Sequence, residues 1–434
     1  MKQTVNIFWF RRDLRLDDNA GLFEALQGKH PVLPIFIFDS DILGKLPKDD
    51  ARVTFIYEVL QKTKRTLQEN YESNIALYYG NPLDVFKQLI ETYVIINVYT
   101  NHDYEPYATQ RDKTIKEFLS TISINFKTYK DQVVFEKNDI VKSNRTPYLV
   151  YTPYMKSWKT TFKATNLEIF KSEAHLNNLI KETQLPNLTI TELGFKTSKQ
   201  KIVDYDVTSA MIQNYEATRN FPSQDSTSRL GPHLRFGTVS IRKIIKKAMA
   251  EKNEVLWQEL IWREFFMQIL WHFPHTATQS FKPQYDRIVW RNNEIEFKAW
   301  CDGKTGYPLV DAGMHQLNKT GFMHNRVRML VGSFLCKHLL IDWRWGEAYF
   351  AEKLHDYEMA SNLGNWQWVA GCGVDAAPYF RIFNPTTQLE KFDKNLDYIK
   401  QWVPRFQELT YPTPIVDHKI ARERCLEVYK AALV

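Results

Sequence analysis

Cysteine is scarce in this chain of 434 residues, and long hydrophobic runs are absent. The four cysteines are far apart and form no CxxC pair: Cys301, Cys336, Cys372 and Cys425. A zinc site or a disulfide framework is therefore not expected, and a reducing, cytoplasmic compartment fits this cysteine usage. No stretch of about 18 consecutive apolar residues occurs, so no membrane span is predicted. Arg11 and Arg12 follow the first apolar residues too soon for a secretory signal.

A glycine-rich phosphate loop is also missing where a nucleotide-binding sheet would carry it. The first predicted strand, VNIFWF at 5–10, runs into RRDLRLDDN, so neither a Walker nor a dinucleotide fingerprint follows it. Residues 371–376 match GxGxxA, but they lie in helical sequence without a surrounding βαβ unit, and we interpret that match as chance.

The composition is otherwise that of a globular protein, with 44% hydrophobic and 25% charged residues. The net charge of +7 permits a nucleic-acid partner without requiring one. Ten of the 12 tryptophans follow residue 250. Packing of a large core explains such an excess, and so would a function that uses aromatic rings.

Short β-branched or aromatic runs alternate with helical patterns over residues 1–130. The predicted strands are 5–10, 32–38, 74–79, 94–100 and 124–129, and the predicted helices between them include 51–69, 82–93 and 108–121. In the second of these helices, Asn81 and Pro82 are expected as N-cap and first residue. Alternation of this kind predicts an α/β domain with a doubly wound parallel sheet.

The pattern changes twice after residue 130. Residues 131–200 are polar and broken by prolines, which predicts a connection between domains, although its segment TPYLVYTPYMKSW is aromatic enough to be packed. Residues 201–434 have helical periodicity throughout and predict a larger, all-α domain. Its expected helices are 202–219, 240–250, 254–272, 307–319, 324–340, 346–360 and 389–402.

Three segments of the helical domain combine side chains that could bind a ligand. TSRLGP at 227–232 could hold a phosphate through hydroxyls, a guanidinium and backbone N–H groups, although an ordinary helix cap explains it equally. Helical spacing places Glu259, Trp262 and Arg263 on one face, where a carboxylate and an indole could bind a flat ring or simply form a surface ion pair beside the core. Asn325 and Met329 share a helical face in the same way, with a capped helix and a core methionine as the alternative.

A last cluster, LHDYEMASNLGNWQW, brings acids, an amide and two tryptophans together. Each segment alone is a weak indication of function, but their combination in one domain is a specific one. Together with WFRRDLRLDDN, TSRLG, ELIWREFF, GKTGYPLVDAGMHQL, FMHNRVRM and DAAPYFRIFNPTTQ, they resemble the photolyase–cryptochrome family over nearly the whole chain. Within that family the chain resembles the class I enzymes that repair cyclobutane pyrimidine dimers in DNA.

The resemblance implies that the helical domain binds FAD. The residues implied to contact it are Tyr215, Thr227, Ser228, Arg229, Leu230, Gly231, Arg263, Arg328, Asp356, Glu358 and Asn362. Among these, Asp356 paired with Arg328 would meet the isoalloxazine edge, and Asn362 would lie near flavin N5. The family usually has an aspartate where this chain has Glu358, which changes the contact expected there.

The resemblance also implies a repair pocket, an electron-transfer chain and a DNA-binding face. Pyrimidine dimers flipped out of the duplex would meet a pocket built from Glu259, Trp262, Asn325, Met329 and Trp368. Electrons would reach oxidised flavin through Trp290, Trp343 and Trp366. Phosphate contacts are expected, by position or by charge alone, from Arg219, Arg326, Arg381 and Lys391, each of which could equally be a solvated surface charge.

An antenna pigment in the α/β domain is the least defined expectation. Glu105 stands at a position that contacts folate in some family members, but other folate contacts are not recognisable. Folate, a deazaflavin, FMN or an empty site therefore stay open.

The predicted function is light-driven repair of pyrimidine dimers, by a lyase that we expect to be a monomer without a metal ion or a membrane partner. The alternatives are a non-enzymatic blue-light receptor of the cryptochrome type, a photolyase for six-four photoproducts, or a plain FAD-dependent redox enzyme. The intact Glu/Trp/Asn/Met pocket and the short sequence after the last motif favour the first reading over the receptor.

Overall fold

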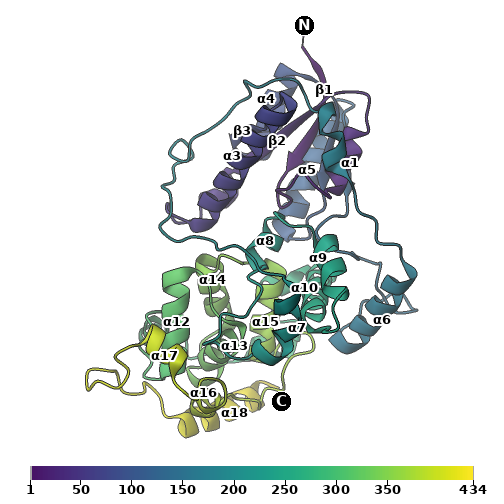
Figure 1. The fold of residues 1–434 in the computed structure, drawn as a ribbon. Coiled ribbons are helices and arrows are strands. Elements are labelled where there is room, and N and C mark those ends of the chain that lie inside the picture. Colours follow the sequence, from purple (N-terminus) through teal and green to yellow (C-terminus); the bar gives the residue numbers. More distant parts are fainter. Residues whose placement is uncertain (1, 434) are drawn as a thin grey trace. The chain divides into compact units, whose positions relative to one another are not determined.

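Strands and helices alternate in the N-terminal part of the computed structural model, which describes residues 2–433 (Figure 1). The strands are β1 (Thr4–Phe10), β2 (Val32–Asp39), β3 (Ala76–Gly80), β4 (Val94–Asn101) and β5 (Asn125–Tyr129). The helices between them are α1 (Ala20–Leu26), α2 (Ser40–Leu43), α3 (Ala51–Tyr71), α4 (Pro82–Thr92) and α5 (Pro106–Thr121). The predicted strands and helices are confirmed, and Asn81 caps α4 by accepting a hydrogen bond from the Leu83 N–H at 3.0 Å.

The five strands form one parallel sheet in the order β3-β2-β1-β4-β5. Successive side chains of a strand point to opposite faces, so Phe8 and Phe10 of β1 join one apolar cluster while Ile7 and Trp9 join the other. The first cluster includes apolar side chains of α1 and α3, and the second those of α4 and α5. Helices thus cover both faces, and the predicted doubly wound sheet is confirmed.

The remaining helices run from residue 151 to the C-terminal end, and residues 137–433 contain no β-strand (Figure 1). The α-helices are α6 (Tyr151–Ala164), α7 (Ser209–Thr218), α8 (Gly231–Arg235), α9 (Ile241–Met249), α10 (Val255–His272), α11 (Glu294–Cys301), α12 (Pro308–Thr320), α13 (Asn325–Ser333), α14 (Trp343–Lys353), α15 (Met359–Ala370), α16 (Pro385–Phe392), α17 (Asp397–Trp402) and α18 (His418–Leu433). Shorter turns are the 3-10 helices Ser172–Asn178, Pro274–Ala277 and Pro283–Arg287 and the π-helix Phe334–His338. The predicted all-α character of this part is confirmed.

Three predicted helices are wrong in their extent. The helix expected at 202–219 begins only at Ser209, because Thr208 caps α7 by accepting a hydrogen bond from the Met211 N–H. Residues 346–360 do not form one helix, because the chain leaves the helical conformation at Leu354, the C-cap of α14, and resumes it at Met359 in α15. Residues 389–402 divide between α16 and α17, because the Asp393 carboxylate accepts the backbone N–H groups of Tyr398 and Ile399 and so holds a loop there. Apolar periodicity continues across both interruptions, which is why the sequence pattern did not reveal them.

The chain divides into two compact units that are not continuous in sequence. The first comprises Met1–Glu136, Thr161–Tyr205 and Arg229–Lys247, and the second comprises Lys137–Thr160, Asp206–Ser228 and Ala248–Val434. The predicted boundaries at 130 and 200 differ from this division. Leu176, Leu193 and Phe236 pack in the core on one face of the sheet, so segments from the predicted connection and from the predicted helical domain belong to the sheet unit.

The aromatic segment of the predicted connection is packed, as expected. Its residues form α6, in which Tyr151, Tyr154 and Trp158 are buried. The Trp158 indole donates a hydrogen bond to the buried Glu264 carboxylate of α10 at 2.6 Å. This contact ties α6 to the helix that carries the first predicted pocket residues.

None of the helices in the described part of the chain has both the length and the apolar character that crossing a bilayer requires.

Candidate active site

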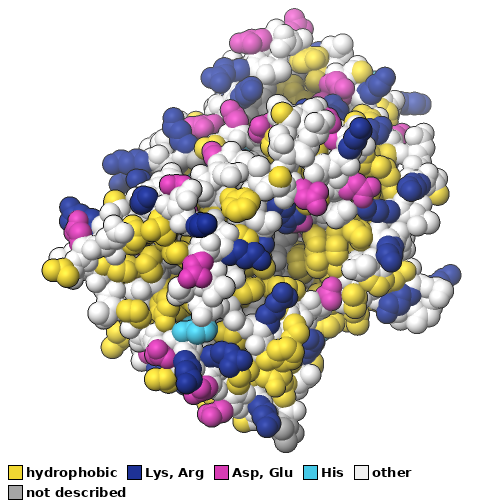
Figure 2. Space-filling model, turned by 60° about the horizontal axis from the view of Figure 1, so that its bottom comes forward, with side chains coloured by type: hydrophobic (Ala, Val, Ile, Leu, Met, Phe, Trp, Pro, Cys, Tyr) yellow, Lys and Arg dark blue, Asp and Glu magenta, His cyan; other side chains and the backbone are white. Residues whose placement is uncertain are grey.

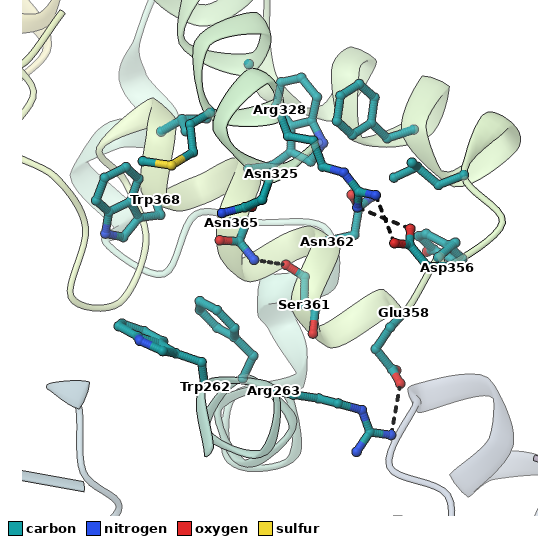
Figure 3. A pocket seen from close by; sticks show the side chains of 18 of the residues that line it. Trp262, Arg263, Asn325, Arg328, Asp356, Glu358, Ser361, Asn362, Asn365 and Trp368 are labelled. Carbon is teal, nitrogen blue, oxygen red and sulfur yellow. Dashed lines mark hydrogen bonds and ion pairs between the residues drawn. The ribbon is translucent and has the colours of Figure 1, made fainter. Parts of the chain in front are cut away.

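A pocket of about 370 Å³ lies within the second unit, between helices α10, α13, α14 and α15 (Figure 3). Its lining is Arg219, Glu259, Trp262, Arg263, Phe266, Asn325, Arg328, Met329, Gly332, Phe350, Leu354, Asp356, Tyr357, Glu358, Ser361, Asn362, Asn365, Trp366, Trp368 and Val369. The volume is within the range of small-molecule sites, which is about 300–1,000 Å³. All five predicted repair-pocket residues are in this lining, although they come from three helices.

Arg328 and Asp356 form a bidentate ion pair at the pocket wall (Figure 3). Arg328 donates from Nη1 to Oδ1 at 3.1 Å and from Nη2 to Oδ2 at 2.8 Å. Its Nε donates to the Met323 carbonyl at 2.7 Å, so the guanidinium is held from both sides. A fork-to-fork pair of this kind fixes the direction in which the carboxylate presents its remaining lone pairs.

Arg263 and Glu358 form a second, looser ion pair in the same pocket (Figure 3). Arg263 Nη2 lies 3.8 Å from Glu358 Oε2, beyond hydrogen-bonding distance, and both side chains are largely buried. The longer glutamate, where the family usually has an aspartate, therefore reaches a cation on α10 while it precedes α15 as its N-cap residue.

The Asn362 amide is oriented by a carboxylate behind it. Asn362 Nδ2 donates to Glu347 Oε1 at 3.0 Å and to the Glu347 carbonyl at 3.2 Å. With its donors directed to Glu347, Asn362 keeps its carbonyl oxygen for the pocket. Burial raises the pKa of Glu347 above its usual value.

Trp262 and Trp368 are two of the aromatic side chains in the lining. In Figure 3, Trp262 of α10 and Trp368 of α15 lie toward one end, and Asp356 lies toward the other. Tyr151 stacks on Trp262 with ring centroids 3.6 Å apart and planes 9° apart. Its hydroxyl donates to the Gln258 carbonyl at 2.7 Å, which holds the ring in that position. One face of Trp262 is thus covered by Tyr151, a residue that is distant in sequence.

Glu259 forms an ion pair with Arg219. Arg219 Nη1 donates to Glu259 Oε1 at 2.6 Å. Burial opposes the charge of Arg219, but the Glu259 carboxylate outweighs it and raises the pKa of Arg219. The adjacent Arg326 has the opposite shift, since burial and the positive charge of Arg219 lower its pKa. Arg326 therefore contributes a guanidinium without an acidic partner among the described residues.

Several predicted FAD contacts do not line this pocket. The Arg219 guanidinium lies over the ring of Tyr215 in α7, 5.3 Å from the ring centroid. Burial, together with the nearby negative charge of Glu259, raises the pKa of Tyr215 to about 12. Thr227 and Ser228 are half-buried in the loop before the sheet unit resumes. Arg229, Leu230 and Gly231 belong to the sheet unit, where Arg229 has a left-handed backbone with φ of 55°.

The three tryptophans predicted for electron transfer differ in their surroundings. Trp366 is buried and lines the pocket. Trp343 is buried at the start of α14. Its Nε1 has no hydrogen-bond partner among residues 2–433, and the Arg344 guanidinium lies 4.8 Å from the centroid of its ring. Trp290 is half-exposed and meets Tyr429 edge-on at 6.0 Å.

Of the predicted phosphate contacts, only Arg219 is in the pocket lining given above. The Arg326 guanidinium lies over the Phe392 ring, 4.4 Å from its centroid, and the Arg381 and Lys391 side chains are exposed. Figure 2 shows one face of the molecule, on which dark blue lysine and arginine side chains alternate with magenta acidic ones. Positive charge is thus dispersed on that face, in agreement with the modest net charge of +7.

Glu105, the predicted antenna contact, is enclosed by arginines within the sheet unit. Its Oε1 accepts hydrogen bonds from Arg12 Nη1 at 3.1 Å and from Arg235 Nη1 at 2.5 Å. Arg12 also pairs with Asp103 at 3.0 Å. The carboxylate is therefore already compensated by this chain's own cations.

Several lining residues were not predicted from the sequence. Ser361 and Asn365 lie on the same face of α15 as Asn362, and helical spacing would have revealed them if 359–370 had been recognised as a helix. Tyr151 carried no signal, because its partner Trp262 is remote in sequence and only packing brings them together.

The lining fits a flavin. A flat heterocycle needs apolar walls, which Trp366, Phe350 and Val369 provide, and polar partners at its edge, which the Arg328–Asp356 pair and the Asn362 oxygen provide. Arg263 adds a cation suited to phosphate.

Comparison with known proteins gives the same assignment for both parts of the chain. Residues 6–173 match the family described as DNA photolyase, and residues 255–410 match the family described as FAD binding domain of DNA photolyase.

Full-length relatives and solved structures agree with these matches. The deoxyribodipyrimidine photo-lyase of Halobacterium salinarum is 34% identical to this chain, over 99% of this chain and 99% of its own length. That of a Synechococcus species is 36% identical, over 98% of this chain and 97% of its own length. A class III photolyase from Agrobacterium tumefaciens has a TM-score of 0.87 at 32% identity and covers 100% of this chain and 98% of its own. An archaeal photolyase from Sulfolobus tokodaii, solved with two FAD molecules, has a TM-score of 0.84 at 32% identity, over 99% and 100% of the two chains.

Identity above 30% along nearly the whole chain, with matched family regions in both units, shows common descent and not a shared fold alone. The chain belongs to the photolyase/cryptochrome family.

Proposed function

We propose that this protein is a light-driven deoxyribodipyrimidine photo-lyase that binds FAD and repairs cyclobutane pyrimidine dimers in DNA. One observation carries the proposal. A single pocket gathers Glu259, Trp262, Asn325, Met329 and Trp368 with the Arg328–Asp356 pair and the Asn362 oxygen. The residues proposed to bind the flavin and those proposed to bind the pyrimidine dimer thus line the same pocket.

Trp262 and Trp368 are proposed to hold the lesion. A pyrimidine dimer is poorly stacked in a duplex, so flipping it out costs less than flipping a normal base. Contact between a base and an aromatic side chain is worth roughly 1–3 kcal/mol. Tyr151 stacks on Trp262, and Phe266 lies 5.5 Å from it with planes 30° apart, so the part of the indole that lines the pocket is proposed to meet the fused pyrimidines.

Glu259 is proposed to hydrogen-bond the imide and carbonyl edge of the lesion. Bound FAD, fully reduced and excited by light, supplies the one electron that opens the cyclobutane ring and that returns afterwards. The Arg219 partner of Glu259 would add a positive charge beside a lesion held by Glu259. Asn325 and Met329 complete the wall beside it.

At the flavin edge, the Arg328–Asp356 pair and Asn362 are proposed to orient the ring. The bidentate geometry of the pair allows little rotation of either side chain. Glu347 holds the Asn362 amide so that its oxygen faces the pocket, where it can accept a hydrogen bond from flavin N5. Tyr215, Thr227, Ser228, Arg229, Leu230, Gly231 and Glu358 remain proposed FAD contacts on the family resemblance.

Trp366, Trp343 and Trp290 are proposed to carry electrons to oxidised flavin, which keeps the protein in its active reduced form. Trp366 lines the pocket and Trp290 is half-exposed, so the series leads from the site toward solvent.

The direct test is repair of a defined lesion. An oligonucleotide with one thymine dimer, incubated with the chemically reduced protein, should regain two thymines under blue light and none in the dark. Chromatography of the digested product measures this. A Glu259→Gln variant with unchanged FAD content is the matched control and should repair fewer dimers per absorbed photon.

Two outcomes of the same test would contradict the proposal. Repair of six-four photoproducts with no activity on thymine dimers would identify the other lesion class. Light-dependent flavin reduction without any repair would favour a receptor of the cryptochrome type.

The sheet unit is proposed to be an antenna-type domain. The Sulfolobus relative was solved with two FAD molecules, which supports a second pigment as one option beside folate, a deazaflavin or FMN. Mass spectrometry of pigment released from the purified protein identifies it. Because Glu105 is paired with Arg12 and Arg235, a pigment that contacts this carboxylate would share it with two arginines.

DNA phosphates are proposed to bind Arg219, Arg326, Arg381 and Lys391, and the chain is proposed to act as a monomer inside the cell, where its substrate is. Light scattering during size-exclusion chromatography tests the oligomeric state.

A further inference from the structure

Lys337 places an ammonium group in the core of the second unit. The residue lies on the π-helix Phe334–His338, and only 1% of its surface is exposed. Among residues 2–433, its Nζ forms no ion pair with an acidic side chain. Burying a charge is costly unless its surroundings compensate it, so Lys337 depends on the neutral groups around it.

Two backbone carbonyls and one aromatic ring face the ammonium group. Nζ donates to the Ala370 carbonyl at 2.8 Å and to the Tyr379 carbonyl at 3.2 Å. It also lies over the ring of Tyr429 in α18, 3.8 Å from the centroid, where the ring attracts a cation. Ala370 is the last residue of α15, and the carbonyl end of a helix carries a partial negative charge that favours a cation.

The charge of Lys337 is retained in these surroundings. Burial lowers the pKa of Lys337 to about 8, so the amine is still protonated at neutral pH. The titratable groups beside it are the Tyr429 hydroxyl and the thiols of Cys336, Cys372 and Cys425, and burial raises the pKa of all four. These groups are therefore neutral, and carbonyl dipoles and a ring compensate the ammonium charge.

The two carbonyls stand at the two ends of one loop, residues 370–379, so the ammonium group closes that loop. Gly371 begins the loop with a left-handed backbone, φ 91°, which favours glycine. At the other end, the Tyr379 ring stacks on Tyr429 with centroids 6.0 Å apart and planes 10° apart. Lys337 and Tyr429 thus hold the end of the loop together.

Side chains with proposed roles in DNA repair lie just beyond the two ends of the loop. Trp368, in the pocket lining, is two residues before Ala370, and Arg381, a proposed phosphate contact, is two residues after Tyr379. A flipped base and its phosphate are covalently joined, so a protein that binds both needs the two contacts at a fixed spacing.

The middle of the loop is attached to the pocket as well. Asp375 Oδ2 accepts a hydrogen bond from the Tyr151 N–H at 3.0 Å, and the Tyr151 ring stacks on Trp262. A shift of the loop would therefore be felt on both sides of the proposed lesion site.

We propose that Lys337 is a positioning residue for damaged DNA, which holds Trp368 and Arg381 at the required spacing by joining the Ala370 and Tyr379 carbonyls. The inference rests on the proposed binding of pyrimidine dimers in this pocket. Lys337 is too deeply buried to touch DNA and acts through the loop. Its loss should weaken substrate binding and leave the light reaction of bound substrate unchanged.

A double-mutant cycle on DNA binding tests this role, with the FAD-loaded full chain in the dark. Arg381→Ala alone should weaken binding of a dimer-containing oligonucleotide by about tenfold, as expected for one lost hydrogen bond to a charged group. Lys337→Met should weaken binding too. In the Lys337→Met background, where Arg381 is no longer held in place, Arg381→Ala should change the affinity by less than about twofold.

Two control variants show whether the coupling is specific. Lys391→Ala, at an exposed position of α16, should weaken binding equally in both backgrounds. Cys336→Ala changes a buried neighbour of Lys337 on the same π-helix and leaves the ammonium contacts intact, so Arg381→Ala should keep its full effect there. Equal effects of Arg381→Ala in the wild-type and Lys337→Met backgrounds would overturn the proposal.

The repair yield separates positioning of the substrate from a part in the reaction. At equal FAD content, wild type and Lys337→Met should repair the same number of bound dimers per absorbed photon. Unchanged affinity in Lys337→Met would overturn the proposal, and so would a loss confined to the yield per bound dimer.

Proteolysis reports on the loop without DNA. Trypsin should cleave after the exposed Arg381 faster in Lys337→Met than in Cys336→Ala, because the loop is released, and equal rates would contradict the proposal. If Lys337→Met does not fold, Lys337→Gln keeps an N–H donor at this point and replaces it in every measurement. Failure of both variants to fold and take up FAD would assign Lys337 to folding alone and overturn its positioning role.

Failure of the proposed repair function gives a different pattern. A protein that binds dimer-containing DNA and shows the coupling between Lys337 and Arg381, but repairs no dimers, would keep this inference and reject the repair activity. A protein that repairs dimers without this coupling would keep the repair activity and reject the inference.

Discussion

At the scale of single residues, the pocket is organised by side-chain pairs in which one member holds the other in place. Asp356 is held by Arg328, the Asn362 amide by Glu347, Glu259 by Arg219 and the Trp262 ring by Tyr151. Fixed orientation is valuable at such a site, because a ligand then finds its polar partners already in position. Each pair is partly or fully shielded from water, so loss of one member leaves the other without compensation.

Asp356→Asn should weaken both the fold and flavin binding. The substitution leaves the Arg328 guanidinium without its carboxylate in a site where both side chains are largely buried, with 23% and 18% of their surfaces exposed. We expect a loss of about 1–3 kcal/mol in the free energy of unfolding, and a lower ratio of flavin to protein after purification.

Urea unfolding and the absorption spectrum measure these two effects. Asp286→Asn is the matched control, since it breaks an ion pair with Arg344 in which one third of each side chain is exposed, and it should cost no more than about 1 kcal/mol. Equal losses in the two variants would mean that the Arg328–Asp356 pair has no special role.

At the scale of helices and strands, close approach between α14 and α15 depends on one missing side chain. Gly346 faces the Trp366 ring, and a Cβ there would lie 2.1 Å from it and 2.6 Å from the Leu335 side chain. The glycine thus determines how deeply Trp366 sits beside the pocket.

Gly346→Ala should destabilise the helical unit by about 1–3 kcal/mol, because overpacking forces a buried ring or a helix to move. Thermal or urea unfolding measures the loss. Ala348→Ser, at an exposed position of the same helix, is the control and should change stability by no more than about 0.5 kcal/mol. If the two variants are equally stable, α14 and α15 do not pack as tightly as this geometry requires.

The sheet unit contains a buried ionic cluster that joins three elements. Asp131, after β5, accepts hydrogen bonds from Arg15 Nη2 and from Arg242 Nη2 of α9, each at 2.8 Å, and Arg242 also pairs with Asp18. Burial alone would raise the pKa of Asp131, but the two arginines outweigh it and lower the pKa to about 2.

This shift predicts loss of stability in acid. A carboxyl whose folded pKa is below its usual value of 3.8 stabilises the fold above that pH, and the contribution disappears as pH falls through about 2. Asp131 should therefore contribute a decline in the free energy of unfolding of about 1.4 kcal/mol per pH unit within this window. Asp131→Asn should be less stable at neutral pH but should lack this decline. Urea unfolding at several pH values measures it, and an unchanged acid slope would contradict the assignment.

At the scale of the whole molecule, charge is modest and mixed, with 57 basic and 50 acidic residues. Such a balance does not attract DNA strongly from every side, so local arginines without acidic partners must provide most of the phosphate binding. Arg326 is such a residue, half-buried beside Arg219.

Arg326→Ala should weaken binding to dimer-containing DNA and reduce the slope of log K against log salt concentration by about 1, as expected for one lost phosphate contact. Fluorescence polarisation of a labelled oligonucleotide at several salt concentrations measures the slope. Arg405→Ala removes the same charge from a site that is exposed and paired with Glu408. A slope that changes equally in both variants would mean that Arg326 acts only through net charge.

Much of the fold could be predicted because its signals are local. The sheet elements follow from runs of β-branched and aromatic residues between amphipathic helices, and each run is read within about ten residues. The breaks at 354–358 and between α16 and α17 were missed, because carboxylates and caps end those helices while the apolar spacing continues.

The residue types available for the site, the parallel sheet and the helical character of the second half were all predictable from the residues alone. Which side chains meet depends on tertiary packing: Tyr151 with Trp262, Arg219 with Glu259, and Trp300 with Trp366. The reason is physical. Helical and strand spacing is set by neighbouring residues, whereas these pairs are set by how helices pack, and packing depends on side-chain shapes along the entire interface.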